Sequence, residues 1–315
     1  MATQTHPLTP ADRNAMIAMR SMVEPNKGKL EGIGARAPFD AIMLGVAAPQ
    51  SVTYRPQVVG GIPGWWCSPA SAAPGQTILH VHGGWFNWGS AEAYRHLVGH
   101  IARSAGAEAF VPDYRLAPEH PFPAGLNDIV ACYRALAANG ANRIAITGDS
   151  AGGNLALVLL RLTTAHASPD VVRPVAAVVL SPVTDLAMTG PSWDTRATAD
   201  PYFVRSQAAA LIGSYLNGAD PMSPMASPLY GDLAGLPPIR VQVGDDEVLL
   251  DDASRFVERA AAAGVDAQLD VWQGMPHGFH GGIGQSTAAT QALDLIGAFL
   301  QERLTALRTN GQTQP

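Results

Sequence analysis

Short runs of apolar, β-branched residues alternate with longer segments of helical periodicity along most of this chain. Such runs are typical of buried strands, and the segments between them are long enough to be crossover helices. This alternation favours βαβ units, and therefore an α/β fold whose mostly parallel sheet has helices on both faces. Strands are expected at residues 51–59, 77–81, 109–112, 143–147, 175–181, 239–243 and 267–272, and helices at 91–104, 124–138, 152–165, 252–263 and 287–307.

Two segments interrupt the alternation. Residues 1–45 are helix-prone and precede the first expected strand, and residues 184–232 are far longer than an ordinary connection. Long inserts often carry function, and open α/β sheets bind ligands at their carboxyl edge. We therefore expect both segments to form a helical cap over that edge, although residues 1–45 could instead be a packing appendage. The predicted organisation is an N-terminal part of the cap at 1–45, a core at 46–183 and 233–308, a cap insert at 184–232 and a frayed tail at 309–315.

Composition excludes several classes of protein. The 20 basic and 26 acidic side chains give a formal charge of −6 without a basic cluster, which argues against nucleic-acid binding. The two cysteines, Cys67 and Cys132, cannot build a disulfide framework or a four-cysteine zinc site. No signal peptide and no membrane-length apolar run is evident, so we expect a soluble, cytoplasmic protein.

The sequence G-D-S-A-G at residues 148–152 follows one of the expected strands and precedes a helix. This is the G-x-S-x-G pattern in the strand–turn–helix setting that a nucleophilic serine requires. Its glycines allow a tight turn that exposes the serine at a helix N-terminus, where partial positive charge favours a developing anion. We predict that Ser150 is a nucleophile, the alternative being a serine that only caps the helix. The chain contains no phosphate-binding G-x-x-x-x-G-K-[ST] loop.

A second glycine motif follows the strand at 77–81. Adjacent glycines can leave backbone N–H groups free to stabilise the oxyanion of a tetrahedral intermediate. We assign this role to Gly83 and Gly84, together with the N–H of Ala151, which follows the proposed nucleophile. The ring of His82 is expected to hold this loop. A metal-binding pair of His80 and His82 is the alternative, but no further ligand is evident.

A nucleophilic serine needs a base, and the base needs an orienting carboxylate. In this type of fold the order along the chain is serine, acid, histidine. The turn after the strand at 239–243 offers Asp245, Asp246 and Glu247, and spacing alone does not choose among them. The loop after the last strand offers His277, with His280 as its rival. We favour His277 because it lies between a proline and a glycine at the correct end of the sheet.

Four ordered blocks carry a family resemblance: H-G-G at 82–84, D-Y-R-L-A-P-E at 113–119, G-D-S-A-G-G at 148–153 and H-G-F at 277–279. With these blocks, nearly the whole sequence resembles the hormone-sensitive-lipase-like branch of the α/β-hydrolase superfamily. The resemblance implies a mostly parallel, eight-stranded sheet with a helical cap. It also implies a catalytic triad of Ser150, Asp246 and His277. Residues 244–252 and 275–280 look closest to bacterial esterases and lactone hydrolases such as monoterpene ε-lactone hydrolase.

One position departs from the family pattern, because Trp85 stands where the family usually has a third glycine. We expect its indole to narrow the acyl pocket, alongside Phe86 and Trp88, for which plain core packing is an equal alternative. The cap is expected to complete an apolar substrate pocket with Tyr202, Phe203, Leu211 and Tyr215.

The resemblance implies an enzyme that cleaves carboxylic esters of short to medium acyl chain, or lactones, through an acyl-enzyme. This chemistry needs no metal and no organic cofactor. An amide or carbamate hydrolase with the same triad is one alternative, and a non-catalytic ligand-binding relative is another. The relatives also suggest a homodimer that associates through the last strand and the helix at 287–307.

Overall fold

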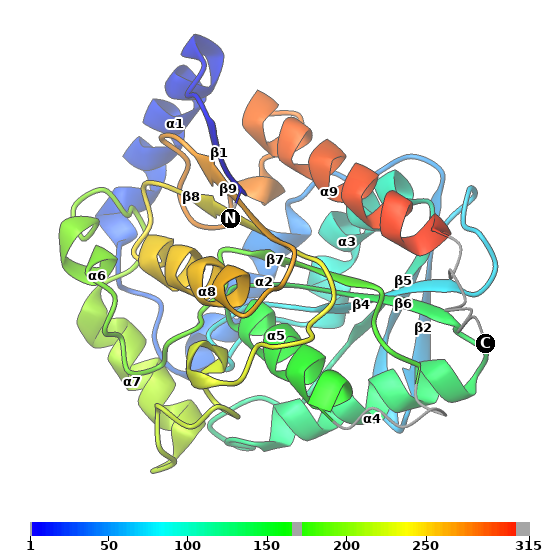
Figure 1. The fold of residues 1–315 in the computed structure, drawn as a ribbon. Coiled ribbons are helices and arrows are strands. Elements are labelled where there is room, and N and C mark those ends of the chain that lie inside the picture. Colours follow the sequence, from blue (N-terminus) through cyan, green and yellow to red (C-terminus); the bar gives the residue numbers. More distant parts are fainter. Residues whose placement is uncertain (1, 166–171, 307–315) are drawn as a thin grey trace.

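A nine-stranded sheet forms the centre of the computed structural model, which describes residues 2–165 and 172–306 (Figure 1). Its strand order is β1-β9-β8-β7-β6-β4-β5-β3-β2. Only the pairings of β2 with β3 and of β3 with β5 are antiparallel, so the predicted mostly parallel sheet is confirmed. The strands are β1 Ala2–His6, β2 Val52–Val59, β3 Ile62–Pro69, β4 Gln76–Val81, β5 Glu108–Pro112, β6 Arg143–Asp149, β7 Ala176–Leu180, β8 Ile239–Gly244 and β9 Ala267–Trp272.

Helices cover both faces of this sheet, as predicted (Figure 1). Helices α3 and α9 pack in one apolar cluster, and α4, α5 and α8 pack in another on the opposite face. Within the described residues, none of the helices has the length and apolar character needed to cross a membrane. The helices are α1 Pro10–Val23, α2 Arg36–Leu44, α3 Ala91–Ala105, α4 Ala124–Ala138, α5 Ser150–Ala165, α6 Ser192–Thr195, α7 Arg205–Leu216, α8 Leu250–Ala262 and α9 Thr287–Thr305.

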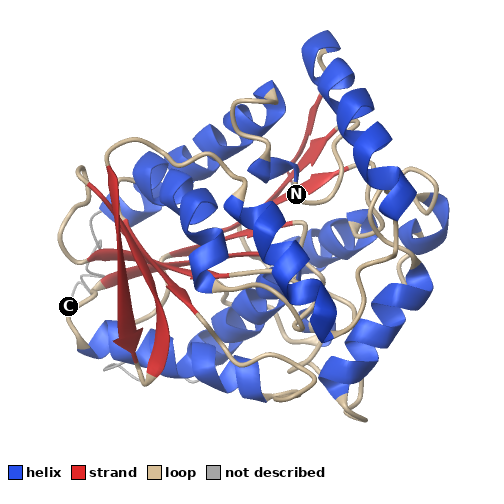
Figure 2. Cartoon of the chain, turned by 180° about the vertical axis from the view of Figure 1, so that it is seen from behind, coloured by secondary structure: helices blue, strands red, loops and turns tan. Residues whose placement is uncertain are grey.

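The central strands β4, β6, β7 and β8 are buried along nearly their whole length. Strands covered by helices on both faces need continuous apolar runs, which is why the sequence pattern locates them well. The sheet is strongly twisted, so that its strands at one end run steeply across the direction of the others (Figure 2).

Two strands lie outside the predicted set. Strand β3 was not predicted because Pro63 and Gly64 are unfavourable in strands. Gly60 and Gly61, both with positive φ, form a two-residue turn that pairs β3 with β2. Strand β1 is a short polar segment that exists only through its parallel pairing with β9. The sheet therefore has nine strands rather than the eight expected, and residues 2–6 belong to it instead of the cap.

The N-terminal segment after β1 and the insert at 184–232 pack against one another, and α1, α6 and α7 lie at one side of the sheet (Figure 1). Hydrogen bonds that join the two segments include Lys27 Nζ to Ala197 O at 2.6 Å, the N–H of Gly28 to Tyr202 O at 2.9 Å, and Gln207 Nε2 to Leu30 O at 2.7 Å. A cap built from both segments is the organisation that these contacts favour. The predicted tail at 309–315 lies outside the described residues.

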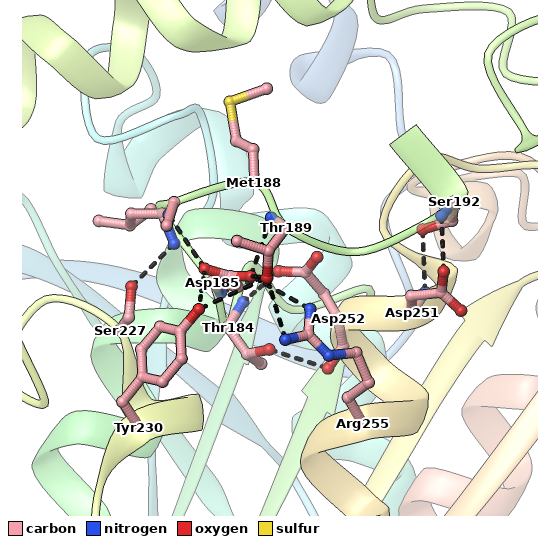
Figure 3. A network of polar contacts seen from close by, with 12 residues as sticks. Thr184, Asp185, Met188, Thr189, Ser192, Ser227, Tyr230, Asp251, Asp252 and Arg255 are labelled. Atoms are coloured by element: carbon pink, nitrogen blue, oxygen red, sulfur yellow. Dashed lines mark hydrogen bonds and ion pairs between the residues drawn. The ribbon is translucent and has the colours of Figure 1, made fainter. Parts of the chain in front are cut away.

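A polar network fixes the point where the insert leaves the sheet (Figure 3). The N–H groups of Thr184 and Asp185 donate to one carboxylate oxygen of Asp252, at 2.7 and 2.9 Å. Asp185 in turn accepts from Arg255 at 3.1 Å and from Tyr230 Oη at 2.9 Å. Burial raises the pKa of Asp252 to about 8. Helix α8 therefore holds the start of the insert through a buried pair of carboxyl groups and one arginine.

Candidate active site

The nucleophile turn joins β6 directly to α5. Ser150 is the first residue of α5 and has φ of +53°, in the left-handed region that non-glycine residues rarely adopt. A Cβ on Gly148 would lie 2.6 Å from Gly152 O, and one on Gly152 would lie 2.0 Å from Val81 O. Both glycines are therefore required by close backbone approach, as the motif predicts.

The helix N-terminus beside this serine supplies one free donor. Ala151 is the second residue of α5, and the first N–H groups of a helix have no partner within it. These groups also form the positive end of the helix dipole. The N–H of Ala151 is therefore suited to stabilise an anion next to Ser150.

In the glycine loop after β4, one of the predicted oxyanion donors, Gly83, already has an acceptor. The N–H of Gly83 donates to Asp149 Oδ1 at 3.0 Å, so it is not free to stabilise an oxyanion. The N–H groups of Gly84 and Trp85 have no acceptor in the part of the chain that the structure describes. A Cβ on Gly84 would lie 2.3 Å from Trp88 O, which explains the glycine there. The two residues that directly follow Gly83 in this loop, Gly84 and Trp85, are therefore the candidate donors in place of Gly83.

Trp85 keeps the backbone shape of the glycine that it replaces. Its φ is +53°, and that of Phe86 is +62°, both in the left-handed region. Such a conformation favours glycine, which is consistent with the usual glycine at this position. The indole therefore changes the surroundings of the loop while the backbone N–H stays free.

Asp149, the residue before the serine, ties the glycine loop to the nucleophile turn. Besides Gly83, it accepts a hydrogen bond from Tyr94 Oη at 3.0 Å, and His80 Nε2 lies 3.4 Å from its Oδ1. Nothing in the spacing of the sequence indicated this role. The contact sets the register between the two loops that would surround a reacting carbonyl.

The ring of His82 lies inside the glycine loop. His82 Nδ1–H donates to Gly83 O at 2.8 Å and its ring stacks on Tyr114, as expected for a ring that holds this loop. Burial lowers the pKa of His82 to about 4, so it is neutral at neutral pH. Over residues 2–165 and 172–306, no group of three or more His, Cys, Asp or Glu side chains is placed to hold a metal ion.

The acid that contacts the candidate base is Glu247, and the assignment to Asp246 is wrong. His277 Nδ1–H donates to Glu247 Oε2 at 2.8 Å. The other oxygen of Glu247 accepts from Ser181 Oγ at 2.7 Å and from the N–H of Gly244 at 2.6 Å. Glu247 is fully buried, and three donors hold its carboxylate in one orientation.

The other two acids of this turn point elsewhere. Asp246 Oδ2 accepts from Arg20 Nη2 at 2.7 Å, and its side chain is 28% exposed. Asp245 Oδ1 accepts from the N–H of Gly274 at 2.5 Å. Three consecutive carboxylates thus have three different partners, because each successive residue of the turn projects in a new direction.

The electrostatics of His277 suit a general base. Burial lowers its pKa, but the hydrogen bond and charge of Glu247, followed by the charges of Asp200 and Asp149, outweigh burial and raise the pKa above its usual value. The rival His280 contacts Gln242 Oε1 at 3.0 Å in the interior, and burial lowers its pKa to about 3. His277 is therefore the histidine that could exchange a proton near neutral pH.

The candidate residues gather at one edge of the sheet. Ser150 follows β6, Glu247 follows β8 and His277 follows β9, and these strands are parallel. The carboxyl ends of parallel strands meet at the same edge, which is where open α/β sheets place their ligands. The arrangement can support acyl transfer with a serine, a histidine base and a buried carboxylate.

Among the predicted substrate contacts, Phe203 lies beside the base, and Trp85 lies beside Phe203. The ring of Phe203 is 5.0 Å from that of His277 and 5.2 Å from that of Trp85, both edge-on. Trp193 extends this aromatic cluster, with its ring 6.3 Å from Trp85. Trp193 was not among the predicted contacts, although it lies in the same insert as Phe203.

Three other predicted substrate contacts are used in packing. Phe86 and Tyr215 stack face to face, with ring centroids 3.8 Å apart. The indole N–H of Trp88 donates to Gly32 O at 2.8 Å, which joins the glycine loop to the N-terminal segment. All three side chains are buried, which agrees with the packing alternative considered for Phe86 and Trp88, although Trp85 is buried to the same extent.

The remaining two predicted contacts join the insert to other parts of the chain. The carbonyl oxygen of Leu211 accepts from Asn87 Nδ2 at 3.1 Å, and the Leu211 side chain is buried. The hydroxyl of Tyr202 donates to the sulfur of Met19 in α1 at 3.3 Å. These contacts hold the insert against the core and against α1.

Comparison with known proteins identifies one family. A family model described as alpha/beta hydrolase fold matches residues 78–281, which include every candidate residue from the glycine loop to His277. The chain is 38% identical over 245 residues to an acetyl-hydrolase of Streptomyces hygroscopicus, covering 77% of this chain and 81% of that protein. It is 38% identical over 253 residues to an esterase of Acinetobacter venetianus, covering 79% and 82%.

Solved structures agree with this comparison. The structure of an esterase from the bacterial hormone-sensitive lipase family superposes with a TM-score of 0.86 at 38% identity, covering 92% of this chain and 98% of the other. An esterase/lipase from an uncultured bacterium superposes with a TM-score of 0.86 at 34% identity, covering 93% and 99%. The likeness therefore extends over more than nine-tenths of the chain.

Proposed function

Since this chain belongs to the hormone-sensitive-lipase branch of the α/β-hydrolase family and is a carboxylic ester hydrolase, we propose that it acts through a serine acyl-enzyme. Ser150 is the nucleophile, His277 is the general base and Glu247 orients the base. The observation that carries this proposal is the contact of His277 Nδ1–H with Glu247, 2.8 Å long and fully buried on the carboxylate side.

Acylation begins when Ser150 Oγ attacks the ester carbonyl carbon and its proton passes to His277 Nε2. Glu247 keeps the other ring proton on Nδ1 and stabilises the imidazolium that forms. The tetrahedral intermediate then collapses, the bond to the alkoxy oxygen breaks, and the alcohol leaves with the proton from Nε2. The acyl group is now bound to Ser150.

Deacylation repeats the same steps with water. A water molecule gives a proton to His277 Nε2 as it attacks the acyl carbon, and the proton returns to Ser150 Oγ as the acid leaves. In both tetrahedral intermediates the oxyanion accepts from the N–H groups of Gly84, Trp85 and Ala151. Loss of one such donor typically lowers kcat by about 10²–10³.

The aromatic cluster of Trp85, Phe203 and Trp193 supports esters of short to medium acyl chain, or lactones, as substrates. Bulky rings next to the base leave less room for a long chain than the glycine usual at position 85 would. Names of relatives, such as acetyl-hydrolase, agree with small acyl groups. A series of p-nitrophenyl esters should peak below about C8, and a peak above about C12 would contradict this assignment.

The test of the mechanism is Ser150→Ala. We expect loss of at least about 10⁴ in kcat on p-nitrophenyl butyrate with an unchanged circular-dichroism spectrum. Stoichiometric labelling of the wild-type serine by an organophosphate should disappear in the variant. Retained turnover would remove Ser150 from the mechanism. Matched amide and carbamate substrates would reveal the alternative hydrolase activities.

The edge of the last strand, β9, which was expected to form a homodimer interface, is covered by β1. The outer edge of β9 is already paired with β1, so a partner strand could add there only if β1 left. Helix α9 is the part of the expected interface that β1 does not occupy. Sedimentation velocity on the full chain would test this association.

A further inference from the structure

Residues 2–20 lie beside the elements that carry the proposed base and acid. Strand β1 pairs in parallel with β9, from Ala2 opposite Gln268 to His6 opposite Trp272. The ring of His6 stacks on Trp272 at 3.9 Å, and His6 O accepts from the N–H of Gln273 at 3.0 Å. The loop that bears His277 starts at this point, so β1 fixes its first end.

Asp12 in α1 fixes the other end of the same loop. It is 2% exposed and accepts from the N–H of Thr287 at 2.7 Å and from Ser286 Oγ at 3.0 Å, where α9 begins. Burial would raise its pKa, but hydrogen bonds from Thr287, Thr9 and Ser286 lower it to about 2. A charged carboxylate therefore caps α9, at the positive end of its dipole.

Arg20, in the last turn of α1, reaches the turn that bears the proposed acid. Its Nη2 donates to Asp246 Oδ2 at 2.7 Å, and its Nη1 donates to Ala199 O in the insert at 2.7 Å. The N–H of Asp246 donates to Met275 O in the histidine loop at 3.2 Å. Arg20 thus links α1, the insert and the residue next to Glu247.

Helix α1 contributes little to the apolar core. Asp12 is its one fully buried side chain, whereas Ile17 and Met22 are 61% and 69% exposed. Apolar burial is the usual reason for a helix to dock. Two buried or partly buried polar side chains of α1 reach the surroundings of the loops that carry His277 and Glu247: Asp12 at the start of α9, and Arg20 at Asp246.

We propose that residues 2–20 form a clamp that positions the base and the acid relative to Ser150, with Arg20 as a positioning residue. The inference rests on the proposed function, and no residue of the clamp touches the reacting atoms. Ser150 lies on a rigid strand–helix junction, whereas His277 and Glu247 lie on loops. Displacements of about 1 Å in such groups can lower the rate by about 10²-fold, so anchoring both loops sustains kcat.

The test compares Arg20→Gln with Arg20→Lys, and with Arg205→Gln as a matched control. Arg205 is also an arginine of the cap and pairs with Asp194 at 3.3 Å, away from both loops. We expect Arg20→Gln to lower kcat on p-nitrophenyl butyrate by about 10-fold or more, with KM changed less than about 3-fold. Arg20→Lys, which keeps a hydrogen-bond donor beside Asp246 Oδ2, should recover most of the rate, and Arg205→Gln should match the wild type.

A readout independent of turnover is the low-field proton NMR signal of His277 Nδ1–H, which should shift or broaden in Arg20→Gln and stay unchanged in Arg205→Gln. Wild-type kcat and an unchanged signal in Arg20→Gln would overturn the clamp, and so would an equal loss in Arg205→Gln. If the wild-type chain hydrolyses no ester, the proposed function fails, while the proton signal still decides for or against the clamp.

Discussion

Replacing Glu247 by glutamine should lower kcat by about 10³–10⁴, because it moves the ring proton of His277 from Nδ1 to Nε2. One oxygen of Glu247 accepts from Ser181 Oγ and from the N–H of Gly244, so the amide oxygen must take that place. The amide nitrogen then faces His277 Nδ1, at the position of the 2.8 Å contact. An amide NH₂ only donates, so Nδ1 must lose its proton and Nε2 must carry it. In that tautomer the ring cannot accept the proton of Ser150.

The matched control is Asp246→Asn, the same chemical change one residue earlier. Its amide oxygen can still accept from Arg20 Nη2, and a partly exposed ion pair contributes about 0–1 kcal/mol, so kcat should fall less than about 5-fold. Steady-state hydrolysis of p-nitrophenyl butyrate at pH 8, with urea unfolding of each variant, measures both. A loss in Asp246→Asn as large as that in Glu247→Gln would refute the assignment of the acid.

Three further predictions concern the base, the serine turn and the start of the insert. Because the pKa of His277 is raised and the neutral ring is the base, kcat/KM should rise with pH through a midpoint above 6.5; a midpoint below 6 would contradict this. Gly152→Ala should destabilise the fold by about 3 kcal/mol in urea unfolding, since its Cβ would meet Val81 O at 2.0 Å; a loss under about 1 kcal/mol would show that the turn can adjust. The pKa of Asp252 is raised from 3.8 to about 8, so folding favours its neutral form and stability falls as pH rises between these values; Asp252→Asn should remove this slope between pH 5 and 9, and an unchanged slope would assign it to other groups.

Local steric and burial requirements allowed the central strands and the serine turn to be predicted from the sequence. The runs that became β4, β6 and β7 are mostly apolar because helices cover both faces of the sheet, and the sequence pattern shows this requirement directly. The nucleophile turn was equally readable. The glycines at 148 and 152 have no alternative when a Cβ would meet backbone within 2.6 Å.

The predictions that failed depended on direction or on distant pairing. Spacing placed three acids after β8 but could not say which one faced His277, since that depends on how the turn aims each side chain. The assignment of Gly83 as a donor failed because the side chain of Asp149, which is 66 residues further along the chain, takes its N–H.

The sequence by itself therefore determined the parallel sheet, the serine turn and the histidine loop, because neighbouring residues carry those constraints. Only the tertiary structure decided that Glu247 is the acid beside the histidine, that Asp149 accepts the N–H of Gly83, and that β1 completes the sheet. Each of these depends on groups brought together from distant segments. A hydrogen bond of this kind leaves no periodic trace in the chain, since its partners are selected by packing and not by their separation along the sequence.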